Sequence, residues 1–70
     1  MKKANKHAKK ARQQMALCIE CQGDSEAAHG YEDAAYGYAL KAIAAGYEPA
    51  AALAKEVLVL GDLDFDRWYA

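Results

Sequence analysis

Alanine dominates the apolar residues of this chain, and this bias constrains the fold more than any other feature. Hydrophobic residues fill 54% of the 70 positions, yet 17 of them are alanine and only ten are Leu, Ile or Val. Alanine is the best helix former, but each one buries little apolar area. We therefore expect one small domain, 1–70, made of helices that pack closely through small side chains. The short length excludes a two-domain enzyme with a cleft between domains.

Apolar periodicity predicts the first two helices. The first covers 4–22, and Gly23 is predicted to stop it in a left-handed conformation. Its stripe recurs at three- and four-residue steps: Ala4, Ala8, Ala11, Met15 and Cys18. The second begins after Asp24 or Ser25 as the cap and runs to Ala45, with Gly46 as its stop. Gly30 is expected to split off its first segment, because a glycine inside a helix costs about 1 kcal/mol relative to alanine.

The third predicted helix covers 49–60, with Pro49 at its first position. Its core stripe is Leu53, Val57 and Leu60. The run 57–60 also suits a strand, but no second run exists to pair with it, so helix is preferred. Gly61 is expected to end the helix. Asp62 or Asp64 then caps a last turn that contains Phe65, Trp68 and Tyr69. The predicted fold is all-α, a compact bundle of three helices plus a short C-terminal helical turn.

The net charge of −1 hides a division along the chain. Residues 1–19 contain six basic residues and no acid, whereas 20–70 contain ten acids and three bases. The six are Lys2, Lys3, Lys6, Lys9, Lys10 and Arg12. Positive charge at a helix N-terminus opposes the macrodipole, so the basic segment 1–12 is expected to fray at its first turns. Such a split indicates one end that attracts polyanions and one that suits a basic surface.

The sequence offers no set of residues for catalysis. Ser25 is the single serine, there is no threonine, and its position suits a helix cap. The chain contains no glycine-rich loop of the kind that holds phosphates. We therefore expect a protein that is not an enzyme and that needs no cofactor.

Cys18 and Cys21 form a C-x-x-C pair near the end of a predicted helix. The dipole raises a thiol pKa at that end, whereas a redox pair needs it lowered. A structural zinc site needs four ligands, and only His7 and His29 could complete it. The preferred interpretation is two small core residues and no metal. No secretory signal and no membrane-spanning run is recognised, so the expected location is the cytoplasm, without membrane contact.

Two kinds of binding surface compete for the function. The basic segment suits the phosphates of nucleic acid, with a steeply salt-dependent affinity. A helix-turn-helix reader is rejected, because 49–54 offers almost no hydrogen-bonding side chain for base edges. The other surface combines carboxylates with aromatic rings that suit protein interfaces. Its members are Glu26, Tyr31, Glu32, Asp33, Tyr38, Asp62, Asp64, Asp66 and Trp68.

From about residue 24 onward, the chain combines these acids with interleaved aromatic residues: Tyr31, Tyr36, Tyr38 and Trp68. It resembles the small phage-encoded inhibitors of which anti-CRISPR proteins are the best-known group. The resemblance implies a non-enzymatic protein in the host cytoplasm that occupies a basic groove on a larger protein or ribonucleoprotein complex. The acidic face would stand in for nucleic acid there. The basic first helix departs from a purely acidic mimic.

The leading hypothesis is therefore an inhibitor that blocks a nucleic-acid-binding surface through its acidic, tyrosine-bearing face. The first alternative is a small nucleic-acid-binding accessory protein that uses the basic segment. The second alternative is a helical homodimer with a structural role, joined through the face that carries Gly30 and Gly37.

Overall fold

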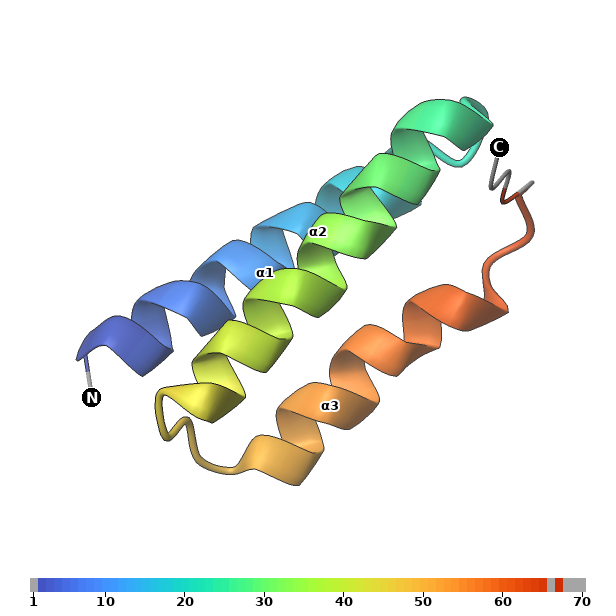
Figure 1. Ribbon diagram of the computed structural model, residues 1–70. Helices are drawn as coiled ribbons and strands as arrows, with labels where there is room; N and C mark the ends of the chain where they lie inside the picture. The colour runs from blue at the N-terminus through green and yellow to red at the C-terminus, as the bar shows by residue number, and fades with distance from the viewer. Residues whose placement is uncertain (1, 66, 68–70) are drawn as a thin grey trace.

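The computed structural model describes residues 2–65 and 67, which form an all-α bundle as predicted (Figure 1). Helix α1 covers Lys2–Glu20, α2 covers Ser25–Ala44 and α3 covers Ala50–Leu58. A 3₁₀ turn, η1, follows at Val59–Asp62. Helices α1 and α2 form an antiparallel hairpin with the most extensive helix–helix contact, and α3 lies alongside this pair.

Alanine builds the contact between α1 and α2. Small buried residues recur every seven positions on each helix: Ala4, Ala11 and Cys18 on α1, and Ala28, Ala35 and Ala42 on α2. Ala8 and Ala39 are buried between them. Small side chains let two helix backbones approach closely along such a repeat. The stripe predicted for the first helix is confirmed, although its Met15 is only partly buried.

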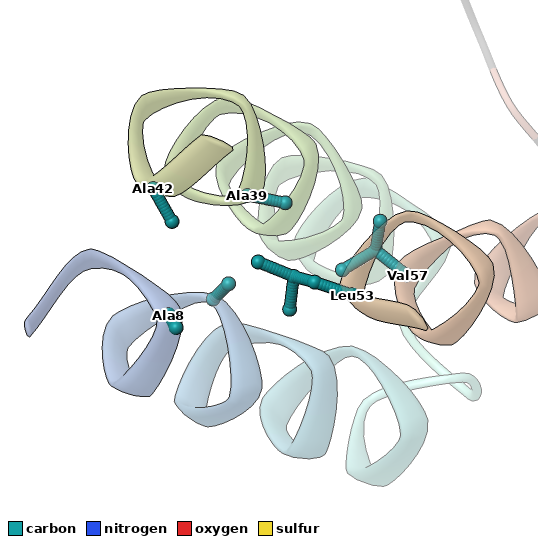
Figure 2. Close-up of a cluster of buried hydrophobic side chains, with 6 residues drawn as sticks. Ala8, Ala39, Ala42, Leu53 and Val57 are labelled. Carbon is teal, nitrogen blue, oxygen red and sulfur yellow. The ribbon is translucent and has the colours of Figure 1, made fainter. Parts of the chain in front are cut away.

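Helix α3 supplies the branched side chains that the alanine hairpin lacks. Leu53 is fully buried and points between α1 and α2, close to Ala8 and Ala39 (Figure 2). Val57 joins the same cluster, and Leu60 of η1 fills a second cluster with Cys18. The predicted core stripe of the third helix is therefore confirmed.

Helix α2 begins and ends where local chemistry predicts. The Ala27 backbone N–H donates to Asp24 Oδ1 at 3.2 Å, which caps the helix, and Gly46 has a φ of 94° just beyond its end. The expected break at Gly30 is wrong, because the helix is continuous there. Ala28 and Ala35, which precede and follow Gly30 in α2, are fully buried. Their packing outweighs the cost of about 1 kcal/mol of a glycine in a helix.

Both ends of α1 differ from the prediction. The helix begins at Lys2, two residues before the predicted start. It ends at Glu20, and Gly23 does not adopt a positive φ. The Asp24 N–H donates instead to the carbonyl of Cys21 at 2.9 Å, and Gln22 Nε2 donates to the Ile19 carbonyl at 3.0 Å. These bonds close the turn without a left-handed residue.

The C-terminal part also departs from the expected turn. Pro49 precedes α3 as its N-cap, and the 3₁₀ turn continues through Gly61. Residues 63–65 are not helical. The Arg67 guanidinium donates hydrogen bonds to the carbonyls of Leu60, Leu63 and Phe65. The predicted positions of Asp66, Trp68 and Tyr69 lie outside the described residues.

Candidate functional site

The antiparallel hairpin turns the charge division of the sequence into a division in space. Ala8 of α1 packs in the same cluster as Ala39 and Ala42, so the first half of α1 lies beside the last half of α2. All five lysines of α1 are exposed, as is Lys41 of α2. With the ring of Tyr38 they form a surface that we name the basic face: Lys2, Lys3, Lys6, Lys9, Lys10, Lys41 and Tyr38.

Tyr38 lies among cations and not among acids. The Nζ atom of Lys10 is 5.5 Å from the centre of its ring, and that of Lys41 is 5.1 Å away. The His7 ring of α1 stacks against the Tyr38 ring, with 6.3 Å between the ring centroids and 24° between the ring planes. The assignment of Tyr38 to the acidic face is therefore corrected, because α2 places position 38 against the basic half of α1.

Arg12 does not belong to the basic face. Its Nε donates to Glu56 Oε2 at 2.8 Å and its Nη2 to Glu56 Oε1 at 3.1 Å. Nη2 also donates to the Tyr47 hydroxyl at 3.1 Å. These bonds raise the pKa of Arg12, and hydrogen bonding from Arg12 lowers the pKa of Glu56. The structure therefore places Arg12, which the sequence predicts to bind nucleic acid, in an ion pair that joins α1 to α3.

The lysines of the basic face, by contrast, are available to a partner. Within residues 2–65 and 67, the side chains in salt bridges with carboxylates are Arg12, His29 and Arg67. No lysine of the basic face pairs with a carboxylate there. Sequence reasoning missed Lys41, although its place three residues after Tyr38 on a helix was a usable signal.

Glu32 is the largest correction to the predicted acidic face. Only 3% of its surface is exposed. Its carboxylate accepts hydrogen bonds from Arg67 Nε at 3.0 Å and Nη2 at 3.2 Å, and from the Tyr36 hydroxyl at 3.0 Å. Glu32 faces inward because its helical position lies over the C-terminal segment that carries Arg67. It cannot contact a partner.

The other described acids of the predicted face lie in the first half of α2 and in residues 62–64. We name the acidic end by its residues: Glu26, Asp33, Asp62 and Asp64, all exposed. A Cβ on Gly61 would lie 3.7 Å from the Tyr36 hydroxyl, which places the start of this C-terminal segment against α2. Tyr31 is half-buried against the second core cluster. Asp66 and Trp68, predicted in this face, lie outside the described residues.

The two cysteines have the geometry of packed thiols. Cys18 is buried and Cys21 is half-buried, and both are free. Burial raises the pKa of Cys18, and the charge of Glu32 raises it further. The described part of the chain holds no group of three or more His, Cys, Asp or Glu side chains that could bind a metal ion.

Comparison with family models, curated proteins and solved structures gives no match. In the described part of the chain, no helix combines the length and the apolar character needed to span a bilayer. Function is therefore inferred from the residues of the chain itself.

Proposed function

We propose that this chain is a non-enzymatic protein that binds the sugar-phosphate backbone of nucleic acid through its basic face. The observation that carries the proposal is that the ammonium groups of Lys10 and Lys41 both lie near the Tyr38 ring, 5.5 Å and 5.1 Å from its centre. An aromatic ring close to cations combines a surface for base stacking with contacts for phosphates. The remaining lysines of α1 extend the positive surface along one helix.

The chemistry of this surface favours contact with phosphates over recognition of bases. Lysine is a flexible point charge, and sequence is read by side chains that match base edges in pairs of hydrogen bonds. Arg12, the residue of α1 best suited to such pairing, is engaged by Glu56. Binding should therefore tolerate any sequence and weaken steeply with salt, because each neutralised phosphate releases counterions.

The test is fluorescence anisotropy with a labelled DNA duplex and with one of its single strands, each titrated at several salt concentrations. Lys10→Glu should weaken binding and reduce the slope of log K against log salt by about 1. Lys55→Glu is the matched control, because Lys55 is exposed on α3 and is not a member of the basic face. Equal affinity for the two variants would overturn the proposal.

Tyr38 gives a second test of the same surface. Tyr38→Phe keeps the ring and should bind as the natural chain does. Tyr38→Leu should lose affinity for the single strand more than for the duplex, because bases stack on a ring only when they are unpaired. Circular dichroism would verify that each variant folds, since Tyr38 is partly buried.

The acidic end supports a second candidate, an inhibitor of the type that anti-CRISPR proteins represent. Four exposed carboxylates lie on α2 and on the segment held against it: Glu26, Asp33, Asp62 and Asp64. They would occupy a basic groove of a larger complex and exclude its nucleic acid, and electrostatic attraction would speed the association. Without Glu32 this surface carries less charge than the sequence predicts.

Capture of a partner by the immobilised chain, followed by a measurement of that partner's nucleic-acid binding, tests this candidate. Asp62→Lys with Asp64→Lys should abolish inhibition, whereas Lys10→Glu should leave it intact. The reverse pattern would favour direct nucleic-acid binding and contradict the inhibitor.

A further inference from the structure

A hollow with several polar side chains lies between α1 and the loop that joins α2 to α3. It measures about 470 Å³, and sites that bind small molecules usually measure about 300–1,000 Å³. Its walls combine two amides, two cations, a small residue and an aromatic ring: Asn5, Lys9, Gln13, Arg12, Ala16 and Tyr47. Among the residues of the basic face, Lys9 alone lines this hollow. The hollow is therefore a second surface, distinct from the one around Tyr38.

Arg12 is held in place at the wall of this hollow. Its Nε and Nη2 atoms donate to the two carboxylate oxygens of Glu56 at 2.8 Å and 3.1 Å, and Nη2 also donates to the Tyr47 hydroxyl at 3.1 Å. These bonds leave the two N–H groups of Nη1 without an acceptor among residues 2–65 and 67. A guanidinium presents its donors in one rigid plane, so fixing one edge also orients the other. Arg12 is thus preorganised to donate to an oxyanion.

Lys9 supplies a net positive charge beside this donor. The Glu56 carboxylate neutralises Arg12, but Lys9 forms no salt bridge with any carboxylate in the described part of the chain. Glu56 itself is not among the described residues that line the hollow. An anion in the hollow therefore meets one uncompensated cation and one oriented pair of N–H donors. A phosphate group suits this arrangement, because its oxygens accept hydrogen bonds from both.

The remaining wall suits a planar heterocycle. Asn5 and Gln13 each lie one helical turn from Lys9 on α1, so the three side chains lie along one side of the helix. A side-chain amide offers both a donor and an acceptor, which is what the edge of a nucleobase needs. The Tyr47 ring supplies an aromatic surface of the kind on which bases stack.

We propose that this hollow binds a nucleotide. Lys9 and Arg12 hold its phosphate, and its base lies against the Tyr47 ring with one edge on a side-chain amide. The volume favours a nucleotide over phosphate alone, and the cations favour a nucleotide over an uncharged nucleoside. The site shares Lys9 with the basic face but does not depend on the proposed function.

Isothermal titration calorimetry with adenosine 5′-monophosphate, adenosine and inorganic phosphate tests the proposal. The nucleotide should bind at least about ten-fold more tightly than either of its parts. Lys9→Ala should weaken nucleotide binding about ten-fold or more, because it removes a charged contact to the phosphate. Lys55→Ala is the control, since Lys55 is exposed on α3 and does not line the hollow. It should leave the affinity unchanged.

A steric variant locates the ligand without changing a charge. Ala16 is exposed on α1, so Ala16→Phe should fold normally while its ring fills the hollow. It should weaken nucleotide binding at least about ten-fold. Ala51→Phe is the matched control, because Ala51 is exposed on α3 and is not a described lining residue. Circular dichroism would verify the fold of both variants.

A free nucleotide and a nucleotide within a single strand offer the same chemistry. Ala16→Phe should also weaken binding of a labelled single strand if the strand is the ligand, and should leave it unchanged if the free nucleotide is. Lys10→Glu, which tests the basic face, should leave adenosine 5′-monophosphate binding unchanged, so the two proposals fail separately. A nucleotide that binds no more tightly than phosphate would overturn the proposal. So would equal weakening by Ala16→Phe and Ala51→Phe.

Discussion

The guanidinium of Arg67 donates two hydrogen bonds to the carboxylate of Glu32, 35 positions earlier in the chain, at 3.0 Å and 3.2 Å. The same guanidinium donates to the carbonyls of Leu60 at 2.8 Å, Leu63 at 3.1 Å and Phe65 at 3.2 Å. One side chain therefore satisfies the carbonyls at the end of the 3₁₀ turn and fastens this segment to α2. The Arg67 Cζ also lies 3.9 Å from the centre of the Phe65 ring.

We predict that Arg67→Met destabilises the protein by about 3 kcal/mol or more. The substitution leaves the buried Glu32 carboxylate without its counter-charge, and loss of one partner of a buried pair typically costs about 3–5 kcal/mol. A domain of this length has roughly 4–10 kcal/mol of total stability. Denaturant unfolding monitored by circular dichroism would measure the loss, with Lys55→Met as the control at an exposed position.

The double variant separates an unpaired charge from lost packing. Glu32→Leu combined with Arg67→Met removes both charges, so it should be more stable than Arg67→Met alone. If Arg67→Met were as stable as Lys55→Met, the ion pair would have no role in holding the C-terminal segment. If the double variant were less stable than Arg67→Met, the unpaired charge of Glu32 would not be the cause of the loss in Arg67→Met.

The parts of the fold that could be predicted are those that depend on residues close together in the sequence. The alanine stripe of α1, the Asp24 cap and the Gly46 stop depend on spacing and on local backbone chemistry. Which residues form the candidate site could not be predicted from such local patterns. The bonds from Arg67 to Glu32 and from Arg12 to Glu56 join residues 35 and 44 positions apart. A charged residue looks the same in the sequence whether it faces solvent or a distant partner.

The surroundings of Tyr38 could not be predicted for the same reason. Its spacing on α2 placed it near acids, but its surroundings come from α1, which packs against it with Lys10 and His7. The residues that surround Tyr38 depend on the register in which α1 and α2 pack. Because alanines fit against one another in several registers, the sequence pattern alone could not fix it.

Tyr36 should lose its proton unusually late. Burial raises its pKa to about 12, and the hydrogen bond to Glu32 adds to this effect. A free tyrosine ionises near pH 10. A titration of tyrosinate absorbance should therefore show a late component that Tyr36→Phe removes and Tyr31→Phe retains. A titration without such a component, or one in which Tyr31→Phe removes it, would contradict the assignment.

This shift also predicts how stability depends on alkaline pH. Between about pH 10 and 12, unfolded Tyr36 has lost its proton while folded Tyr36 keeps it. The unfolded state then binds fewer protons, so the free energy of unfolding falls as the pH rises. The contribution is fully present below pH 10 and is lost above the folded pKa. Tyr36→Phe should make unfolding less sensitive to pH in this window.

Two glycines should respond in opposite ways to the same substitution. Gly30 lies within α2, and a Cβ there would meet nothing within 4 Å. Gly30→Ala should therefore stabilise the folded chain by up to about 1 kcal/mol. Gly46 has a φ of 94°, so Gly46→Ala should destabilise it by about 1–2 kcal/mol. Thermal unfolding at low protein concentration would compare them. Equal effects would contradict the backbone geometry of Gly46.

The two thiols should differ strongly in reactivity, although only two residues separate them. Cys18 has no exposed surface, and burial raises its pKa. The thiolate is the reactive form, so Cys18 is protected both by access and by protonation. Cys21 lies in the turn after α1 and is half-buried.

We therefore expect iodoacetamide at neutral pH to modify Cys21 first, and Cys18 only as fast as the protein unfolds. Mass spectrometry of peptides from a labelling time course would measure both rates. Cys21→Ser should abolish the fast phase, whereas Cys18→Ser should leave it. Arg67→Met should speed the labelling of Cys18, because the segment that Arg67 fastens contributes Leu60 to the cluster that buries this thiol. Fast labelling of Cys18 in the natural chain would show that this cluster opens without global unfolding.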